Sequence, residues 1–470
     1  GEISGAVVNN SAANTTSLNK NGTGTWVLSG VNTYTGATTI NAGTLSIATI
    51  TNGGVAGALG NSTNAAGNLV LGGGTLEYTG SGNSTDRNFT LTAGTTSTIS
   101  VTNSSAALTI SGTSATTNGA LTKAGSGTLI LSGNNTYSGN TTINAGTLEI
   151  ASTGRLGGGT YSVSITNNGT FIYSGASSQT LSGVISGTGA LTQNGSGMLT
   201  LSNAGNTYGG ATTVNAGTIS LTGSNTNSAT TVNAGGTLIG TGSAGALTVN
   251  SGGFIGAGNA AATPGTLTVG SLTLNGGSTY TWDLGNVSGT AGTNWDLLSV
   301  TNALTINATS GNKFTVAITG SPTGWAPSTS QTWNIMNYGS LANAFDASVF
   351  DYTTSLVGAG TWSFTNNSTS KFIGLTYTVS STSIWTGGAG NWSSGFSTTP
   401  VNANALVFSG AGGTATNNIA SGSLTSLTTI TINSTAGSYT LAANSGSSGF
   451  DASTPLTITG VTNNSANATT

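Results

Sequence analysis

The chain has 470 residues, a formal net charge of −3 from six Lys or Arg and nine Asp or Glu, and neither His nor Cys. Charged residues make up 3% of it, against about 25% in an ordinary soluble domain. Catalytic triads that need His and zinc sites built on His or Cys are excluded, and so little positive charge disfavours nucleic acid as a partner. No run of about 20 apolar residues occurs, so we expect no transmembrane segment.

One sequence pattern occurs three times in the first half of the chain, at residues 22–45, 125–148 and 195–219. Each copy alternates apolar and hydroxyl residues, which is typical of strands, and Gly or Asn interrupts it every five to eight residues, as tight corners require. A unit of about 20 residues cannot bury its apolar face alone, whereas stacked coils bury it together. We therefore predict an all-β chain with a right-handed parallel β-helix, or β-solenoid, over residues 1–275.

The repeated pattern is Gly-x-Gly-x-Leu-x-Leu-x-Gly-x-Asn-Thr-Tyr-x-Gly-x-Thr-x-Ile-x-x-Gly-Thr-Leu. It resembles the passenger-associated strand repeat of bacterial autotransporters. The resemblance implies a β-helix that is extracellular or exposed at the surface of a bacterium.

The composition changes near residue 276, since seven of the eight Trp and four of the five Pro follow it. Strand patterns continue there, but the aromatic residues favour a two-sheet core. We predict an aromatic-rich antiparallel β-sandwich at 276–382. Residues 384–392 then resemble the segment that usually opens such passengers, and strand patterns at 430–432, 439–441 and 456–460 predict that 383–470 resumes solenoid coils.

The two ends of the chain carry similar sequences, at residues 5–16 and 460–470. Neither has the charges or prolines that protect the end of a solenoid. A head-to-tail contact that does not close generates a filament. The leading functional hypothesis is therefore a non-enzymatic structural protein that binds copies of itself in an extracellular fibre, in which the 383–470 segment pairs with the N-terminus of the next copy. The candidate assembly residues are Val7, Val8, Asn9, Asn10, Leu456, Ile458, Val461, Asn463 and Asn464.

The alternative hypothesis is a surface passenger that acts as an adhesin on a host surface or a polysaccharide. Its expected sign is an exposed aromatic patch or groove within 276–382. The opposing expectation is that these Trp residues form the core of that region. Flat Thr arrays, as in ice binding, are disfavoured because the coils vary in length.

We predict no enzymatic activity, no cofactor and no metal. The nine acids form no Asp-x-Asp cluster, and Asp283 and Asp296, each preceded by Trp, are interpreted as residues at strand ends. Asp346 and Asp351 are single acids, too few for an ordinary calcium site. The sequence Asp86-Arg87 is interpreted as a surface ion pair.

The Tyr of the repeat, at positions 34, 137 and 208, lies between Asn-Thr and Gly in each copy. An exposed Tyr there would stack on sugars. A constant place in the motif favours a structural side chain that fills a corner, and we adopt that prediction.

Overall fold

The computed structural model describes residues 1–379 except 12, 260–262, 326–329 and 357–359, and beyond residue 379 only the backbone of short strands. The described residues contain no α-helix, only three short 3-10 segments. The all-β fold class is confirmed. The three 3-10 segments are η1 (Ala66–Asn68), η2 (Gly157–Gly159) and η3 (Ala347–Val349).

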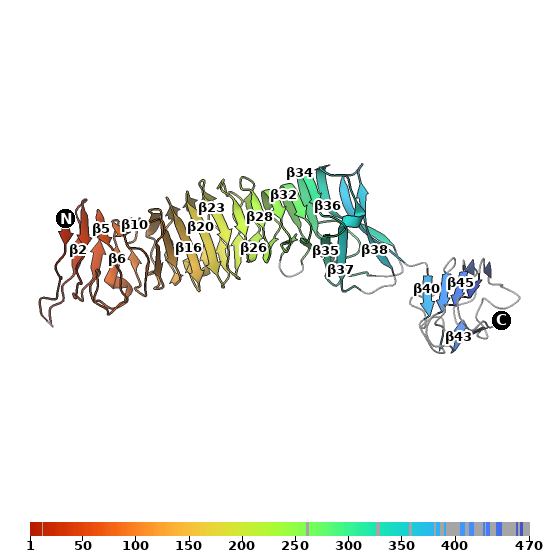
Figure 1. Ribbon diagram of the computed structural model, residues 1–470, viewed down its shortest axis with the longest axis horizontal. Helices are drawn as coiled ribbons and strands as arrows, with labels where there is room; N and C mark the ends of the chain where they lie inside the picture. The colour runs from red at the N-terminus through yellow and green to blue at the C-terminus, as the bar shows by residue number, and fades with distance from the viewer. Residues whose placement is uncertain are drawn as a thin grey trace. The chain divides into compact units, whose positions relative to one another are not determined.

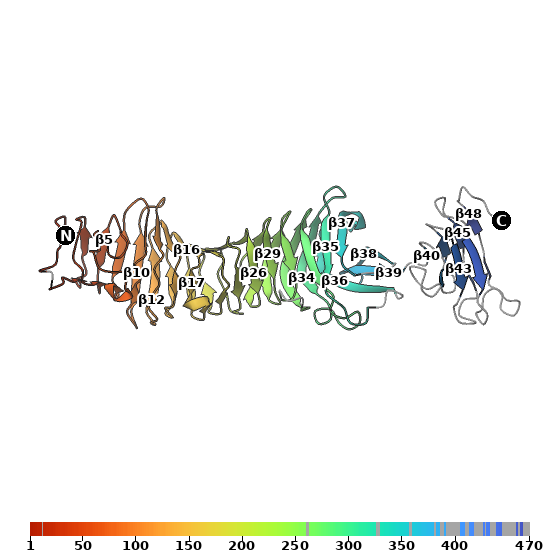
Figure 2. The ribbon, with the colours of Figure 1, turned by 90° about the horizontal axis from the view of Figure 1, so that it is seen from below.

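The chain divides into two compact units. Unit 1 contains residues 1–324, 334–355 and 366–374, and unit 2 contains residues 325–333, 356–365 and 375–470. Unit 1 is a solenoid whose coils follow one another in chain order along one axis (Figures 1 and 2). Its neighbouring strands from β1 to β37 pair in parallel, which confirms the predicted parallel β-solenoid.

The solenoid strands form three long sheets and two short ones. The first sheet contains β1 (Glu2–Ile3), β3 (Thr25–Leu28), β5 (Thr44–Ile47), β7 (Thr75–Tyr78), β10 (Thr96–Val101), β12 (Ala120–Ala124), β15 (Thr141–Ile143), β19 (Ile165–Asn167) and β22 (Ile185–Ser186). The short sheets contain β2 (Leu18–Lys20), β4 (Thr38–Ile40), β6 (Leu69–Leu71) and β9 (Thr90–Leu91), and β14 (Asn134–Asn135) with β17 (Arg155–Leu156).

The second sheet contains β8 (Asn83–Thr85), β11 (Ala107–Ile110), β13 (Thr128–Leu131), β16 (Thr147–Ser152), β20 (Thr170–Gly175), β23 (Ala190–Gln193), β25 (Thr212–Val214), β28 (Thr230–Val232), β30 (Ser243–Val249), β32 (Thr266–Asn275), β34 (Leu297–Asn307), β36 (Gln331–Leu341), β39 (Phe372–Thr378) and β38 (Thr361–Asn367), with β27 (Ser224–Asn225) beside β30. The third sheet contains β18 (Thr160–Tyr161), β21 (Gln179–Leu181), β24 (Met198–Leu201), β26 (Gly217–Leu221), β29 (Gly236–Ile239), β31 (Phe254–Gly256), β33 (Thr279–Asp283), β35 (Phe314–Thr319) and β37 (Phe350–Thr354).

In each sheet, the register places equivalent residues of successive coils next to one another. Residues that point inward are buried and their neighbours in the strand are not, as the alternating burial of β13 and β20 illustrates. Each buried Leu, Ile or Phe stabilises the fold by roughly 1.5–3 kcal/mol. One inward row of the first sheet runs through Trp26, Leu45, Leu76, Ile99, Lys123, Ile143 and Asn167.

The corners of the repeat use glycine where no other residue fits. Gly43, Gly146 and Gly217 occupy the same place in the three copies, and each has a positive φ. A Cβ on any of them would overlap a carbonyl oxygen of the preceding coil. The Gly-Thr-Leu part of the repeat is therefore a condition for close stacking of the coils.

Asparagine side chains connect the later coils along one corner. Asn215 donates to Asn194 at 2.9 Å, and Asn233 donates to Asn215 at 2.8 Å. The same amide-to-amide bonding continues through Asn250, Asn275 and Asn307. Each amide both donates and accepts, so the row satisfies polar groups that parallel strands leave at the corners.

The prediction of an antiparallel sandwich at 276–382 is wrong in its strand pairing. Strands β33, β35 and β37 extend the third sheet in parallel, and β32, β34 and β36 extend the second. The coils become longer here, with 19 residues between the register partners Thr218 and Thr237 but 36 between Thr279 and Thr315. A wider coil encloses a larger core, and buried Trp282 and Phe314 lie in it. Aromatic content therefore marks wide coils, not a different fold.

Antiparallel pairing does occur after the last coil. Thr332 contacts Thr376 and Tyr338 bonds to Lys371, so β36 and β39 run in opposite directions. In unit 2, half-buried Trp325 and Trp362 stack at 5.8 Å between ring centroids. Tyr377 and buried Trp333 lie against Trp362.

Beyond residue 379, the described strands pair in parallel with one another. They form three sheets, which are β40 (Thr382–Trp385), β42 (Ala405–Phe408), β45 (Thr429–Ile432) and β48 (Val461–Asn463); β41 (Gly390–Asn391), β43 (Gly413–Asn417) and β46 (Tyr439–Ala443); and β44 (Ser426–Leu427) with β47 (Thr457–Ile458).

Candidate functional site

The repeated Tyr residues fill corners, as predicted. Tyr34, Tyr137 and Tyr208 are fully buried, and each hydroxyl bonds to the Thr four residues later at 2.6–2.8 Å. Burial raises the pKa of Tyr137 and of Tyr208 to about 12. Since none of these rings reaches the surface, the Asn-Thr-Tyr motif builds the scaffold and does not stack on sugars.

A second buried polar position precedes the Gly-x-Gly turn of each copy, and it holds Lys20, Lys123 and Gln193. Lys20 donates to the carbonyls of Gly22 and Ala42. Lys123 donates to three carbonyls at 2.7–3.2 Å, and Gln193 donates to two at 2.8–2.9 Å. Burial lowers the pKa of Lys123 to about 8. These side chains hold turns of the scaffold together.

The predicted surface ion pair of Asp86 and Arg87 is wrong. Arg87 is buried, and its guanidinium donates to carbonyls of the 48–68 loop and to the Ser62 hydroxyl. The Asp86 carboxylate instead accepts from the backbone N–H of Gly53 at 2.7 Å. Arg87 therefore holds a long loop against the coils.

The N-terminal candidates lie on the first coil. Its backbone is tied to the second coil, since the Val7 carbonyl accepts from Thr33 and the Asn9 side chain bonds to Thr35. Val8 and Asn10 are exposed, whereas Val7 and Asn9 are half-buried.

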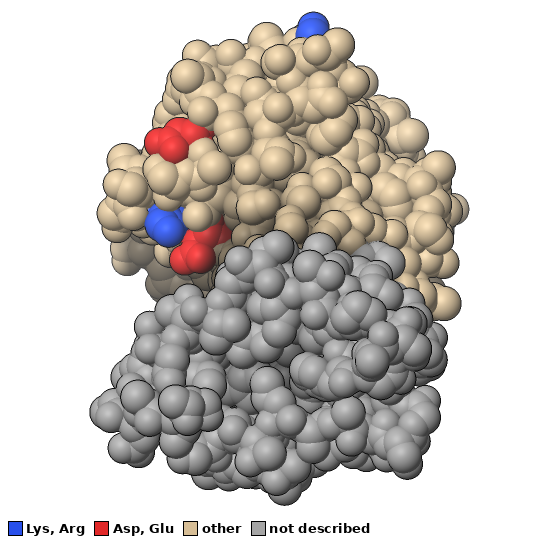
Figure 3. Space-filling model, turned by 90° about the vertical axis from the view of Figure 1, so that its right-hand side faces the viewer, with Lys and Arg blue, Asp and Glu red and all other residues tan. Residues whose placement is uncertain are grey.

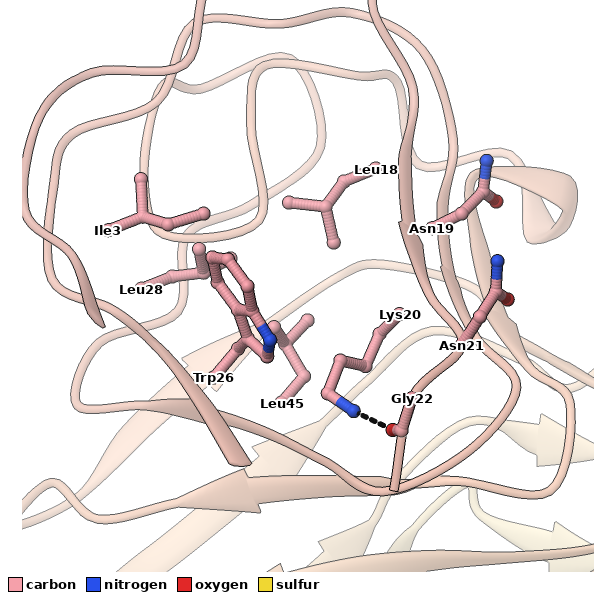
Figure 4. Close-up of a pocket in the computed structure, with 9 residues that line it drawn as sticks. All are labelled: Ile3, Leu18, Asn19, Lys20, Asn21, Gly22, Trp26, Leu28 and Leu45. Atoms are coloured by element: carbon pink, nitrogen blue, oxygen red, sulfur yellow. Dashed lines mark hydrogen bonds between the residues drawn. The ribbon is translucent and has the colours of Figure 1, made fainter. Parts of the chain in front are cut away.

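An apolar cavity of about 360 Å³ opens at this end of the core. Trp26 stands at its centre with Leu18, Leu28 and Leu45 around it (Figure 4). The indole is 45% exposed although it occupies the inward row that is buried in the coils after it. We call this feature the N-terminal opening.

The C-terminal candidates are only partly described. The backbone of Ile458 lies in β47, and that of Val461 and Asn463 in β48, each the last strand of its sheet in the described part. Leu456 and Asn464 lie outside the described residues.

The two acids that follow Trp are brought together, which the sequence did not indicate. Asp283 ends β33, and its backbone N–H donates to Asp296 at 3.1 Å. Asp296 also accepts from Gly265 at 2.9 Å, and burial raises its pKa to about 8. Their interpretation as strand-end residues holds, since Asp283 ends β33 and Asp296 directly precedes β34. In addition, Asp296 is a buried acceptor for the backbone N–H groups of Gly265 and Asp283.

Asp283 also lines a second cavity, on the outward face of the third sheet. We call it the β31 hollow. It has a volume of about 360 Å³, and its lining includes Thr237, Ile239, Gly256, Thr281, Asp283 and Thr319. The Asp283 carboxylate accepts from the Thr319 hydroxyl. The hollow depends on the register of four strands, which no local sequence pattern specifies.

The single acids Asp346 and Asp351 accept from nearby backbone N–H groups, and bonding to Ser348 lowers the pKa of Asp346. No group of three or more potential metal ligands occurs among the residues described. On the face shown in Figure 3, the charged side chains of the described part are few, and one basic side chain lies beside an acidic one. No helix in that part is long and apolar enough to span a membrane.

Parallel coils with buried repeat side chains define a β-solenoid. Residues 18–47, 121–150 and 191–221 each match the passenger-associated-transport-repeat, which confirms the resemblance seen in the sequence. The chain is similar to the adhesin BmaC autotransporter of Brucella suis biovar 1 (strain 1330), with 39% identity over 225 residues. The match covers 41% of this chain and 6% of that adhesin, so the chain spans a small part of the relative's length. Both findings bear out a location outside the cell or at the surface of a bacterium.

Proposed function

We propose that this chain is a non-enzymatic, surface-exposed passenger segment that acts in adhesion. The 39% identity to an adhesin over 225 residues carries the proposal. The structure supports it because the repeat side chains point into the scaffold and leave the outward faces of the coils for contact with a partner.

An attachment assay tests this function. Beads coated with the purified chain are incubated with host epithelial cells and with an immobilised extracellular polysaccharide, next to albumin-coated beads. We expect saturable attachment that the soluble chain inhibits. Attachment equal to that of albumin beads on both surfaces would contradict the proposal.

The same geometry supports the absence of glycoside hydrolysis. That reaction needs two carboxyl groups at the scissile bond. Asp283 is the one acid among the described residues that line the β31 hollow. The nearby Asp296 is not part of this lining, and its two oxygens accept from backbone N–H groups.

Head-to-tail assembly is a second candidate function, favoured by the N-terminal opening. In a filament, strands β47 and β48 of one copy would lie over the coil of Trp26 in the next. Burial of the indole and new ladder bonds would then offset an association cost of about 4–15 kcal/mol.

Electron microscopy and sedimentation at micromolar concentration test the assembly. We expect filaments from the chain, none from Trp26→Asp, and unchanged filaments from Val55→Asp, which alters another exposed apolar residue. A monodisperse wild-type monomer would refute this candidate and leave the adhesin proposal intact.

A further inference from the structure

A glycine stands in the row of outward side chains that lines the β31 hollow. In the third sheet, the outward row passes from Ile239 through Gly256 to Thr281. Gly256 leaves a gap between its two neighbours, and the gap is continuous with the cavity. The φ of Gly256 is not in the positive region, so the backbone does not require glycine there.

The lining of the hollow combines polar and apolar groups in a pattern that suits sugars. Hydroxyls of Thr237, Thr281 and Thr319 border it together with the carboxylate of Asp283, which is 7% exposed. The Ile239 side chain supplies an apolar surface. Small-molecule sites usually combine a few convergent polar groups with apolar surface. Their volumes are roughly 300–1,000 Å³, and the volume of this cavity lies at the lower end of that range.

An exposed aromatic ring stands next to this lining. Phe254 is the register partner of Thr237 and is 40% exposed on the same outward face. Its ring offers an apolar face beside the hydroxyls. A pyranose presents the matching chemistry, with C–H groups on its faces and hydroxyls at its edge.

The charge of the site restricts the class of saccharide. No Lys or Arg occurs between Arg155 and Lys313, and the lining holds the carboxylate of Asp283. Sialylated, sulfated and phosphorylated sugars would meet a like charge without a compensating cation.

We propose that the β31 hollow binds one residue of a neutral saccharide, with Asp283 and the Thr hydroxyls on its hydroxyl groups and Phe254 beside its C–H face. This proposal rests on the proposed adhesive function and names the ligand class for it.

An array of neutral, sialylated and sulfated glycans, probed with the whole chain, tests this assignment. We expect binding to neutral glycans. Gly256→Thr fills the gap, and its Cβ would lie 3.2 Å from Cγ2 of Ile239, which is a tight but flexible contact. Asp283→Asn removes the charge that accepts from sugar hydroxyls. Each variant should weaken binding at least about tenfold.

Two matched variants control for general effects. Thr160→Val removes an outward hydroxyl from the far end of the same sheet, and Gly209→Thr adds the same side chain where a Cβ meets open space. Both should bind glycans as the wild type does, and circular dichroism should be the same for all variants. Binding confined to charged glycans, absence of glycan binding, or full binding by Gly256→Thr would overturn the assignment.

The bead assay separates this proposal from the function on which it rests. If Gly256→Thr attaches to cells as well as the wild type does, the hollow is not the adhesive site but adhesion stands. If the wild type binds neutral glycans on the array but its beads attach to neither surface, the hollow stands and the adhesive function fails.

Discussion

The coils that carry the repeat, residues 18–221, and the coils of residues 222–324 and 334–354 use polar side chains differently. In the first region, Tyr137, Lys123 and Arg87 are buried and bond to side chains or backbone of the scaffold. In the second region Trp282 and Phe314 are buried in the core, while Asp283 borders a cavity on the outward face. Recurrence in the sequence therefore marks residues that build the solenoid, and binding chemistry is to be sought where the repeat is absent.

The largest expected effect tests whether buried polar groups carry the stability of the first region. Arg87→Met removes the donor to the Gly60 carbonyl and to the Ser62 hydroxyl, and one of two donors to the carbonyls of Thr51 and Ser62. We expect the free energy of unfolding to fall by about 3–5 kcal/mol, measured by urea denaturation. Arg155→Met, which changes a half-buried Arg in β17, should cost about 0.5 kcal/mol or less. Equal losses in the two variants would contradict the role given to Arg87.

The next largest effect is the contribution of Lys123 to the pH dependence of the unfolding free energy. Because the pKa of Lys123 is lowered from 10.5 to about 8, the unfolded chain holds this proton between these pH values and the folded chain does not. Stability is therefore gained as pH rises through this interval, by about 3 kcal/mol at roughly 1.4 kcal/mol per pKa unit.

A matched variant isolates this contribution. Lys123→Gln introduces the residue that the third copy carries at position 193, and the buried Tyr residues contribute equally to both proteins. The difference in unfolding free energy, wild type minus variant, should rise by about 3 kcal/mol between pH 7 and 10.5. A difference that is constant over this range would show that Lys123 is not desolvated as the structure indicates.

The sequence predicted the solenoid because period two and the Gly and Asn corners are local properties. It also predicted buried Tyr residues, since a constant place in each copy implies a constant structural role. It did not predict parallel coils at 276–354, because Trp content reports the size of the core and not the direction of pairing. The contact of Asp283 with Asp296 and the gap at Gly256 depend on register across strands, which no local pattern specifies.

A smaller effect concerns the hydrogen bond between the repeat Tyr and the Thr four residues later. Tyr208→Phe removes the hydroxyl that bonds to Thr212 at 2.8 Å but keeps the ring in the core. The Thr212 hydroxyl retains Ser228 as a partner at 2.9 Å. We expect a loss of about 1 kcal/mol in urea denaturation. Tyr352→Phe, at an exposed ring in the second region, should change stability by less than about 0.5 kcal/mol.

The smallest expected effect on stability concerns Phe254. The ring is 40% exposed and faces away from the core, so Phe254→Ala should change the unfolding free energy by about 0.5 kcal/mol or less. Phe171 is buried on the inward face of β20, and its replacement by Ala should cost about 3–5 kcal/mol. The two substitutions remove the same side chain from the two regions. If Phe254→Ala were as costly as Phe171→Ala, Phe254 would be part of the core. If it is nearly free of cost and weakens glycan binding, the ring serves the outward face, which is the division of roles that distinguishes the two regions.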